Sequence, residues 1–254
     1  YSKEKEVSIQ TAKSVYSELK KDRKYKIKVV NPDGKFVDIL RKFKPNTVLN
    51  LLHGRYGEDG YIQAILESEK VKYTHSGVLS SSLAIDKELS KKIYIKNKIL
   101  TPKFLKYSFK NSLNKKKILK KLKSNLGFPL IIKPLNEGSS VNVFICNKKN
   151  VFRNIKRFQE YGEILFEKYI PGREIQVAIL SGKVLGAIEL KPKRKFYDYK
   201  AKYLKSAKTD HIMPANISKK KYYEVLKIAE KTHKVLECRG VTRSDFKFLK
   251  NKFY

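Results

Sequence analysis

The chain has 254 residues, 41% of them hydrophobic, so it can bury the core of one large domain or of two or three small ones. Its apolar residues come in blocks far shorter than the roughly 18 that a membrane helix needs, and its first residues, YSKEKEVSIQ, contain no apolar signal core. The net charge of +34 comes mostly from lysines along the whole chain, whereas nucleic-acid readers gather arginine and aromatic residues on one face, so we expect no nucleic-acid partner.

The first quarter of the chain has the pattern of an α/β domain. Helical spacing over Val7–Leu19 is followed by two strand-like runs, Tyr25–Val30 and Thr47–Leu52, the second apolar enough for the interior of a parallel sheet. A glycine-rich turn, His53–Gly60, then leads into a predicted helix over Tyr61–Ser68. Strand, turn and helix in this order are the repeating unit of such domains.

The middle of the chain combines helices with a hairpin. Apolar residues at helical spacing predict helices over Ser82–Lys98 and Asn114–Leu126. Pro129–Pro134 and Val141–Cys146 are predicted strands around a loop of small residues, which indicates a hairpin.

The last third alternates strands with one long helix. The predicted elements are a strand over Ile164–Tyr169, paired strands over Glu174–Leu180 and Lys183–Glu189, a loop over Lys191–Asn216, a helix over Lys219–Leu236, and a hairpin of Asp245–Leu249 with Lys252–Tyr254. A loop as long as Lys191–Asn216 is uncommon unless it covers a site.

The two cysteines indicate the redox environment of the protein, and the first residues indicate whether the chain is part of a longer one. Cys146 and Cys238 lack metal-ligand spacing, which favours a reduced, cytoplasmic protein over a disulfide scaffold. The chain opens on polar residues without a starting methionine, so we expect a piece of a longer protein.

Two segments could bind phosphate. The turn His53–Gly60 leads into a helix N-terminus, but Glu58 and Asp59 would repel phosphate and are equally typical of acids at the start of a helix. Lys133 ends a buried strand beside Gly138-Ser139-Ser140, whose N–H groups and hydroxyls could hold phosphates; an ordinary hairpin turn is the alternative.

Two further segments suit an active site. Tyr197–Tyr203 holds three tyrosines and two lysines, which favours a lid or an interaction surface over core packing. Arg243-Ser244-Asp245 places a cation beside a carboxylate at a strand start, either for anions and metals or as a surface ion pair.

These motifs together resemble the D-alanine–D-alanine ligase family. HGRYGEDG, DKELSKK, IIKPLNEGSSV, ILFEKYIPGREI, FYDYKAKY and TRSDF occur in the family's order and rough spacing, and YSKEKEVS resembles the loop after its first strand. The resemblance implies an α/β protein with the ATP-grasp fold and an N-terminal Rossmann-like (pre-ATP-grasp) domain. The implied division is residues 1–76 for the Rossmann-like substrate domain, 77–170 for the central ATP-grasp subdomain and 171–254 for the C-terminal one.

The resemblance also implies an activity and an ATP site. Members of the family make an acyl phosphate from ATP and one D-alanine, and the amine of a second D-alanine displaces the phosphate, for peptidoglycan synthesis and cell-wall formation. Three lysines match those that neutralise the ATP phosphates: Lys87, Lys133 and Lys202. The nucleoside contacts match Glu167, Lys168, Ile170 and, for the ribose, Glu174.

The remaining positions match substrate and metal contacts. Glu4 matches the glutamate that binds the ammonium of the first D-alanine. Ser139 and Tyr203 match the residues that hydrogen-bond with this glutamate and lock the lid loop over the site. His53 matches a histidine near the transferred phosphate, and Arg243 an arginine that steadies the substrate carboxylate and the tetrahedral intermediate. Asp245 matches a ligand of Mg²⁺ (or Mn²⁺). A homodimer is expected by analogy.

Two departures from the family pattern affect these expectations. Asn142 stands where the family has glycine, which predicts a slightly stiffer phosphate loop. The family's next motif, with a metal-bridging glutamate, an asparagine ligand and a glycine-rich substrate segment, would follow Tyr254, so we expect the 254 residues alone to be inactive. The alternatives are a ligase that takes D-lactate second, against which Tyr203 argues, and a non-catalytic basic binding protein on the same fold.

Overall fold

The N-terminal region is mostly helical. The computed structural model describes residues 2, 4–110, 114–138, 141–192 and 209–254. Its first helices are α1 (Lys5–Leu19), α2 (Phe36–Phe43) and α3 (Tyr61–Ser68). The predictions for α1 and α3 are confirmed, whereas α2 was not predicted. Its Phe36 and Leu40 pack with two residues of α3, Ile62 and Leu66, in a small core.

The two strands predicted in this region are wrong. Neither Tyr25–Val30 nor Thr47–Leu52 forms a strand; in the part of the chain that the structure describes, their pairing is a single parallel bridge between Val48 and Tyr73. A strand requires a continuous ladder of hydrogen bonds to a neighbour, and an apolar run does not by itself provide that neighbour.

The single helix predicted over Ser82–Lys98 is also wrong, because two helices occur here. α4 (Val78–Ile85) and α5 (Lys87–Lys96) are separated at Asp86, whose backbone is extended, with φ −76° and ψ 106°. The Asp86 carboxylate accepts hydrogen bonds from the backbone N–H groups of Glu88 and Leu89, as the N-cap of a new helix. The cap therefore begins a new helix, α5.

The first sheet has four antiparallel strands in the order β1-β4-β2-β3. Its elements are β1 (Phe104–Ser108), α6 (Lys115–Asn125), β2 (Leu130–Pro134), β3 (Phe144–Cys146), α7 (Val151–Ile155), a 3-10 helix (Lys156–Tyr161) and β4 (Glu163–Lys168). The predicted hairpin of β2 and β3 is confirmed, and so is the strand β4. Leu122 of α6, Ile132 of β2 and Phe166 of β4 belong to the core between this sheet and its helices.

The second sheet has five strands in the order β7-β6-β5-β8-β9. Its elements are β5 (Arg173–Leu180), β6 (Lys183–Lys191), β7 (Asp210–Ile212), α9 (Lys219–Val235), β8 (Val241–Leu249) and β9 (Lys252–Phe253). Both predicted hairpins are confirmed, while β7 lies inside the segment predicted as loop. Val225 and Ala229 of α9 pack with Val177 of β5 in the core.

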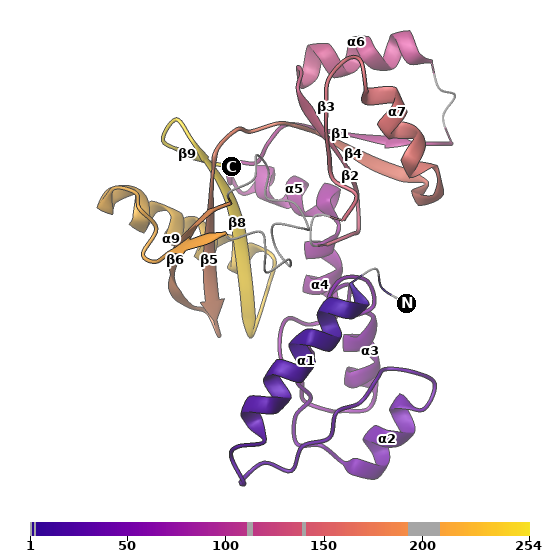
Figure 1. The fold of residues 1–254 in the computed structure, drawn as a ribbon, viewed down its shortest axis with the longest axis vertical. Helices are drawn as coiled ribbons and strands as arrows, with labels where there is room; N and C mark the ends of the chain where they lie inside the picture. The colour runs from indigo at the N-terminus through magenta and orange to yellow at the C-terminus, as the bar shows by residue number, and fades with distance from the viewer. Residues whose placement is uncertain (1, 3, 111–113, 139–140, 193–208) are drawn as a thin grey trace.

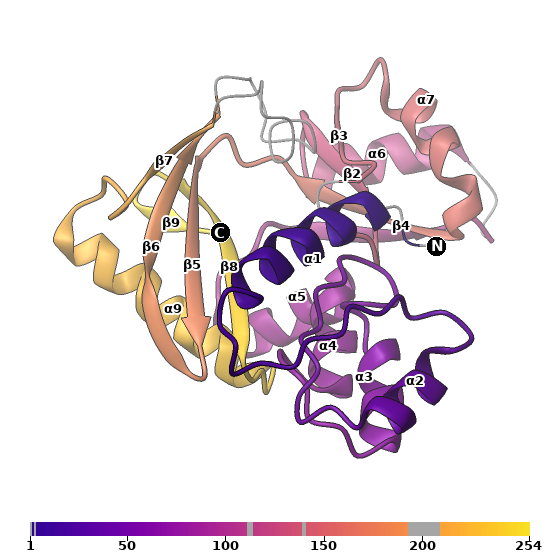
Figure 2. The same ribbon diagram turned by 60° about the horizontal axis from the view of Figure 1, so that its bottom comes forward.

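The two sheets form separate layers, each covered on one face by its own helices, and α4 and α5 lie between them and the N-terminal region (Figures 1 and 2). The chain passes from the first sheet to the second between β4 and β5. The domain division at residues 76 and 170 stays a prediction. None of the described helices is long and apolar enough to cross a membrane.

Candidate active site

A cavity of about 780 Å³ lies where α4, α5, the first sheet, β8 and the loop after Leu52 meet. Its size is that of small-molecule sites, which are about 300–1,000 Å³. The predicted site residues that line it are His53, Lys87, Lys133, Glu167, Lys168, Ile170, Glu174, Arg243 and Asp245. Ser139, Lys202 and Tyr203 lie outside the described residues.

Strand alternation brings Lys133 and Glu167 to the cavity. Side chains of one strand point alternately to the two faces of a sheet. Leu130 and Ile132 of β2 are buried against α6 and α7, so Lys133 points to the opposite face. The register pairs Lys133 with Leu165 on β4, which places Glu167 diagonally beside it on the same face. Their ion pair measures 2.8 Å from Lys133 Nζ to Glu167 Oε2.

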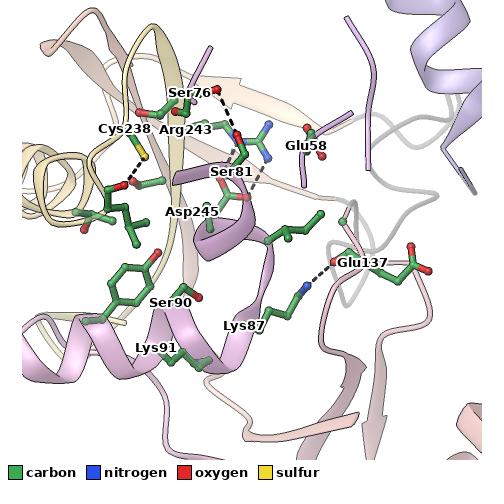
Figure 3. A pocket seen from close by; sticks show the side chains of 18 of the residues that line it. Glu58, Ser76, Ser81, Lys87, Ser90, Lys91, Glu137, Cys238, Arg243 and Asp245 are labelled. Carbon is green, nitrogen blue, oxygen red and sulfur yellow. Dashed lines mark hydrogen bonds and ion pairs between the residues drawn. The ribbon is translucent and has the colours of Figure 1, made fainter. Parts of the chain in front are cut away.

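Lys91 is a second partner of Glu167 and was missed in the sequence analysis. Its Nζ lies 2.7 Å from Glu167 Oε2, and only 6% of the residue is exposed. The sequence carries a signal for it, because Lys91 stands four residues after Lys87 and so shares its helix face. Figure 3 shows both lysines projecting from α5.

Glu167 lies between two positive charges. Burial raises the pKa of Glu167, but the charges of Lys133 and Lys91 together outweigh burial and hold it below its ordinary value. Burial lowers the pKa of Lys91 to about 8, against the opposing charge of Glu167. A buried carboxylate between two ammonium groups therefore stays ionised at neutral pH.

Lys87 begins α5 and reaches the loop after β2. Its ammonium donates to the carbonyl oxygen of Leu135 at 3.0 Å and to that of Glu137 (Figure 3). Burial, reinforced by the charge of Lys133, lowers the pKa of Lys87 to about 7. Lys87 and Lys133 thus line the same cavity, and the repulsion between their charges favours binding of an anion there.

The opposite wall carries Arg243 and Asp245 on β8. Their side chains lie on one face of the strand and form a two-pronged pair, with distances of 2.7 Å from Nε to Oδ1 and 3.0 Å from Nη2 to Oδ2 (Figure 3). Glu174 of β5 pairs with Lys247 of β8. Arg243 and Asp245 are both about half exposed, so the pair can open to a ligand at small cost.

Metal ligands are sparse among the described residues. They contain no group of three or more His, Cys, Asp or Glu side chains that could hold a metal ion. Asp245 supplies a carboxylate, which is engaged by Arg243. Asp245 is thus the predicted Mg²⁺ ligand that the described residues place at the cavity, and Mg²⁺ normally binds one or two carboxylates together with substrate phosphates.

Glu4 lies at the junction of α1, the His53–Gly60 turn and the loop after β2. The residue is 1% exposed. A Cβ on Gly138 would lie 2.9 Å from Glu4 Oε1, and a Cβ on Gly54, whose φ is +71°, would lie 3.0 Å from Glu4 Cδ. A Cβ at either glycine would crowd this carboxylate, and the φ of Gly54 also favours glycine.

His53 is held from several sides. Thr11 Oγ1 lies 3.0 Å from its Nε2, and Glu58 Oε1 lies 3.8 Å from its Nδ1. Glu58 also accepts a hydrogen bond from the Gly54 backbone at 2.8 Å. Glu58 therefore fixes the turn, which supports the structural interpretation of this acid over a phosphate site at the turn itself.

Asn142 occupies a left-handed position, with φ +51°. Glycine adopts this conformation most readily, and asparagine tolerates it better than other side chains. The Asn142 amide donates a hydrogen bond of 2.6 Å to the hydroxyl of Tyr161. The departure from glycine thus adds an anchor to the segment that follows the Gly138-Ser139-Ser140 loop.

Comparison with known families agrees with this geometry. The profile of the family described as "D-ala D-ala ligase C-terminus" matches residues 96–254. A D-alanine–D-alanine ligase of Pelagibacter ubique is 55% identical over 253 residues, which are 100% of this chain and 82% of the relative.

Solved structures show the same similarity. The crystal structure of a D-alanine–D-alanine ligase from Bacillus anthracis aligns with a TM-score of 0.84 at 34% identity, over 100% of this chain and 82% of that one. The B. anthracis ligase complexed with ATP aligns with a TM-score of 0.81 at 31% identity, over 100% of this chain and 81% of that one.

Proposed function

The chain belongs to the D-alanine–D-alanine ligase family, and on that premise we propose that its cavity binds ATP and two D-alanine molecules and joins them through an acyl phosphate. The observation that carries this proposal is the convergence of Lys87 and Lys133 on one cavity, from a helix start and a strand end. Two ammonium groups that face one cavity repel each other, and an anion bound between them would relieve that repulsion.

The lysines suit the phosphates of ATP. Lys87 and Lys133 would lie along the phosphate chain, joined by Lys202, which is outside the described residues. Phosphoryl transfer depends mainly on positioning and charge neutralisation, so cations held in place beforehand supply most of what this step requires. The complex of the B. anthracis relative with ATP supports ATP as the ligand of the cavity.

The nucleoside would lie against the end of β4 and the chain that follows it. Glu167, Lys168 and the backbone at Ile170 would contact adenine, and Glu174 at the start of β5 would contact the ribose. All four residues line the cavity. The nucleotide would then lie between the two sheets, with its phosphates toward α5.

Glu4, His53 and Arg243 would hold the first D-alanine. Glu4 would accept from its ammonium, and Arg243 would steady its carboxylate and the later tetrahedral intermediate. In the first step a carboxylate oxygen attacks the γ-phosphorus of ATP, and the bond to ADP breaks. In the second step the amine of the second D-alanine attacks the acyl carbon, loses a proton and expels phosphate.

Two further groups would complete the site. Ser139 and Tyr203, both outside the described residues, would close the lid over the acyl phosphate and protect it from water. Mg²⁺, when bound at Asp245 with the phosphates, would neutralise charge on the transferred group. The homodimer stays a prediction.

The test is phosphate release driven by D-alanine. Two proteins are compared: residues 1–254, and an extended protein that carries at both ends the corresponding segments of the P. ubique relative. We expect the extended protein to release phosphate with ATP and D-alanine and not with L-alanine. Lack of D-alanine-dependent release in the extended protein would refute the proposal.

The same assay addresses the remaining alternatives. A dipeptide product from D-alanine alone supports the proposal, whereas a depsipeptide from D-alanine and D-lactate would favour the D-lactate alternative. Equal activity in both proteins would overturn the expected inactivity of residues 1–254.

A further inference from the structure

Three lysines surround one carboxylate at the cavity, but their surroundings differ. Lys87 contacts backbone carbonyls, whereas Lys91 and Lys133 both contact the same oxygen of Glu167, at 2.7 and 2.8 Å. One ammonium group is enough to neutralise the single negative charge of this carboxylate, so the second is in excess. One of the two can therefore leave while Glu167 remains neutralised.

The contacts of Lys91 fix it in place. Its ammonium donates to Thr101 Oγ1 at 2.7 Å and to the Pro102 carbonyl oxygen at 3.3 Å, and it forms the ion pair with Glu167. Two hydrogen bonds and one ion pair therefore hold this ammonium. The same nitrogen lies 5.4 Å from the centre of the Phe104 ring, which adds a cation–π contact.

The contacts of Lys133 leave it free to change partner. Its side chain is 17% exposed against 8% for Lys91. Among the described residues its partner is Glu167, so exchange of that partner costs it one ion pair. Lys133 also ends β2 beside the Gly138 loop, where a phosphate would bind.

We propose that Lys91 is a positioning residue, which keeps the Glu167 carboxylate ionised and in place so that Lys133 can leave it for a phosphate of the nucleotide. This inference rests on the proposed function, because it takes the arriving anion to be ATP or ADP. Without Lys91, the departure of Lys133 would leave a buried carboxylate without a counter-ion, and Glu167 would have to take up a proton instead.

The experiment measures ADP binding by calorimetry in the extended protein, with excess Mg²⁺, at pH 7.5 and in buffers of different ionisation enthalpy. The proteins are wild type, Lys91→Met, Lys91→Arg, Glu167→Gln, the double variant of Lys91→Met with Glu167→Gln, and the matched control Lys92→Met. Lys92 is the next residue on α5, and its side chain is 61% exposed.

We expect Lys91→Met to bind ADP about 10-fold more weakly, as for a lost buried charge partner. It should also take up more protons per ADP than wild type, by about one at most, because Glu167 becomes protonated. Lys91→Arg should restore the wild-type proton count, and Lys92→Met should match wild type in both affinity and proton count.

The double variant separates positioning from packing. If Lys91 acts through Glu167, Lys91→Met should have little effect on ADP binding in the Glu167→Gln background, and the extra proton should disappear. This comparison remains decisive if Lys91→Met alone fails to fold.

Two negative outcomes are distinct. A wild-type extended protein that does not bind ADP would refute the proposed function. Normal ADP binding in wild type, with a Lys91→Met variant that matches its affinity and proton count, would overturn only the role of Lys91. An equal loss from Lys91→Met in both backgrounds would also overturn it, because the effect would then not pass through Glu167.

Discussion

The pKa of Lys87 makes nucleotide binding depend on pH. Burial and the charge of Lys133 lower it to about 7, so the free protein loses this charge as the pH rises above 7. A bound phosphate favours the charged ammonium and should return the pKa toward its ordinary range. Because the complex then holds one more proton than the free protein, ADP affinity must fall as the pH rises through this range.

The size of the effect follows from the free-state pKa. Between pH 7.5 and pH 9.0, the charged fraction of a group with a pKa of about 7 falls about 20-fold, and affinity should fall by the same factor, or about 2 kcal/mol. The phosphate of ADP is fully ionised over this range, since its last pKa is near 6. Lys91, with a pKa of about 8, should contribute less because we expect it to keep its partners.

The assay is ADP titration of the extended protein at several pH values from 7.5 to 9.0, with Lys87→Met as the comparison. Methionine keeps the apolar stem of Lys87 and removes its charge. The ADP affinity of the wild-type protein should fall as the pH rises, whereas Lys87→Met should bind ADP weakly and with almost the same affinity at every pH. A wild-type affinity that does not change over this range would refute the argument, and so would a variant with the wild-type slope.

Three further predictions concern the fold. Asp86→Ala removes the cap between α4 and α5, and urea unfolding should show a loss of about 1 kcal/mol; no loss would mean that the cap is dispensable. Asn142→Gly exchanges the hydrogen bond to Tyr161 for a relaxed φ, so its free energy of unfolding should change by less than about 1 kcal/mol; a large gain in stability would show that Asn142 is strained. Glu189→Gln weakens the pair in which Arg173 binds the buried carboxylate at 2.6 and 2.7 Å, and should cost about 2 kcal/mol at pH 7. The hydrogen bonds of Arg173 lower the pKa of Glu189, so the pair stabilises the fold at pH values above the ordinary carboxyl range. The difference in the free energy of unfolding between wild type and variant should therefore shrink as the pH falls through the lowered pKa. A difference that stays constant would contradict this.

Local patterns predicted much of this structure. The hairpins of β2 with β3 and of β5 with β6 follow from alternating residues around short turns, and the long helix α9 follows from its apolar stripe. These elements depend on neighbours in the sequence. The motif residues were identified by resemblance, and those described, except Glu4, line one cavity, while Glu4 lies against Gly138 at the loop beside it.

Other features depend on contacts between segments that are far apart in the sequence, so only the tertiary structure decides them. Thr47–Leu52 has the composition of a strand, but its only described pairing is the bridge at Val48, because strand formation requires a partner that no local pattern supplies. The spacing of four residues places Lys91 on the helix face of Lys87, but no local pattern shows which group Lys91 meets. It becomes part of the site only because β4 brings Glu167, 76 positions later in the chain, to within 2.7 Å of its ammonium and excludes water from both.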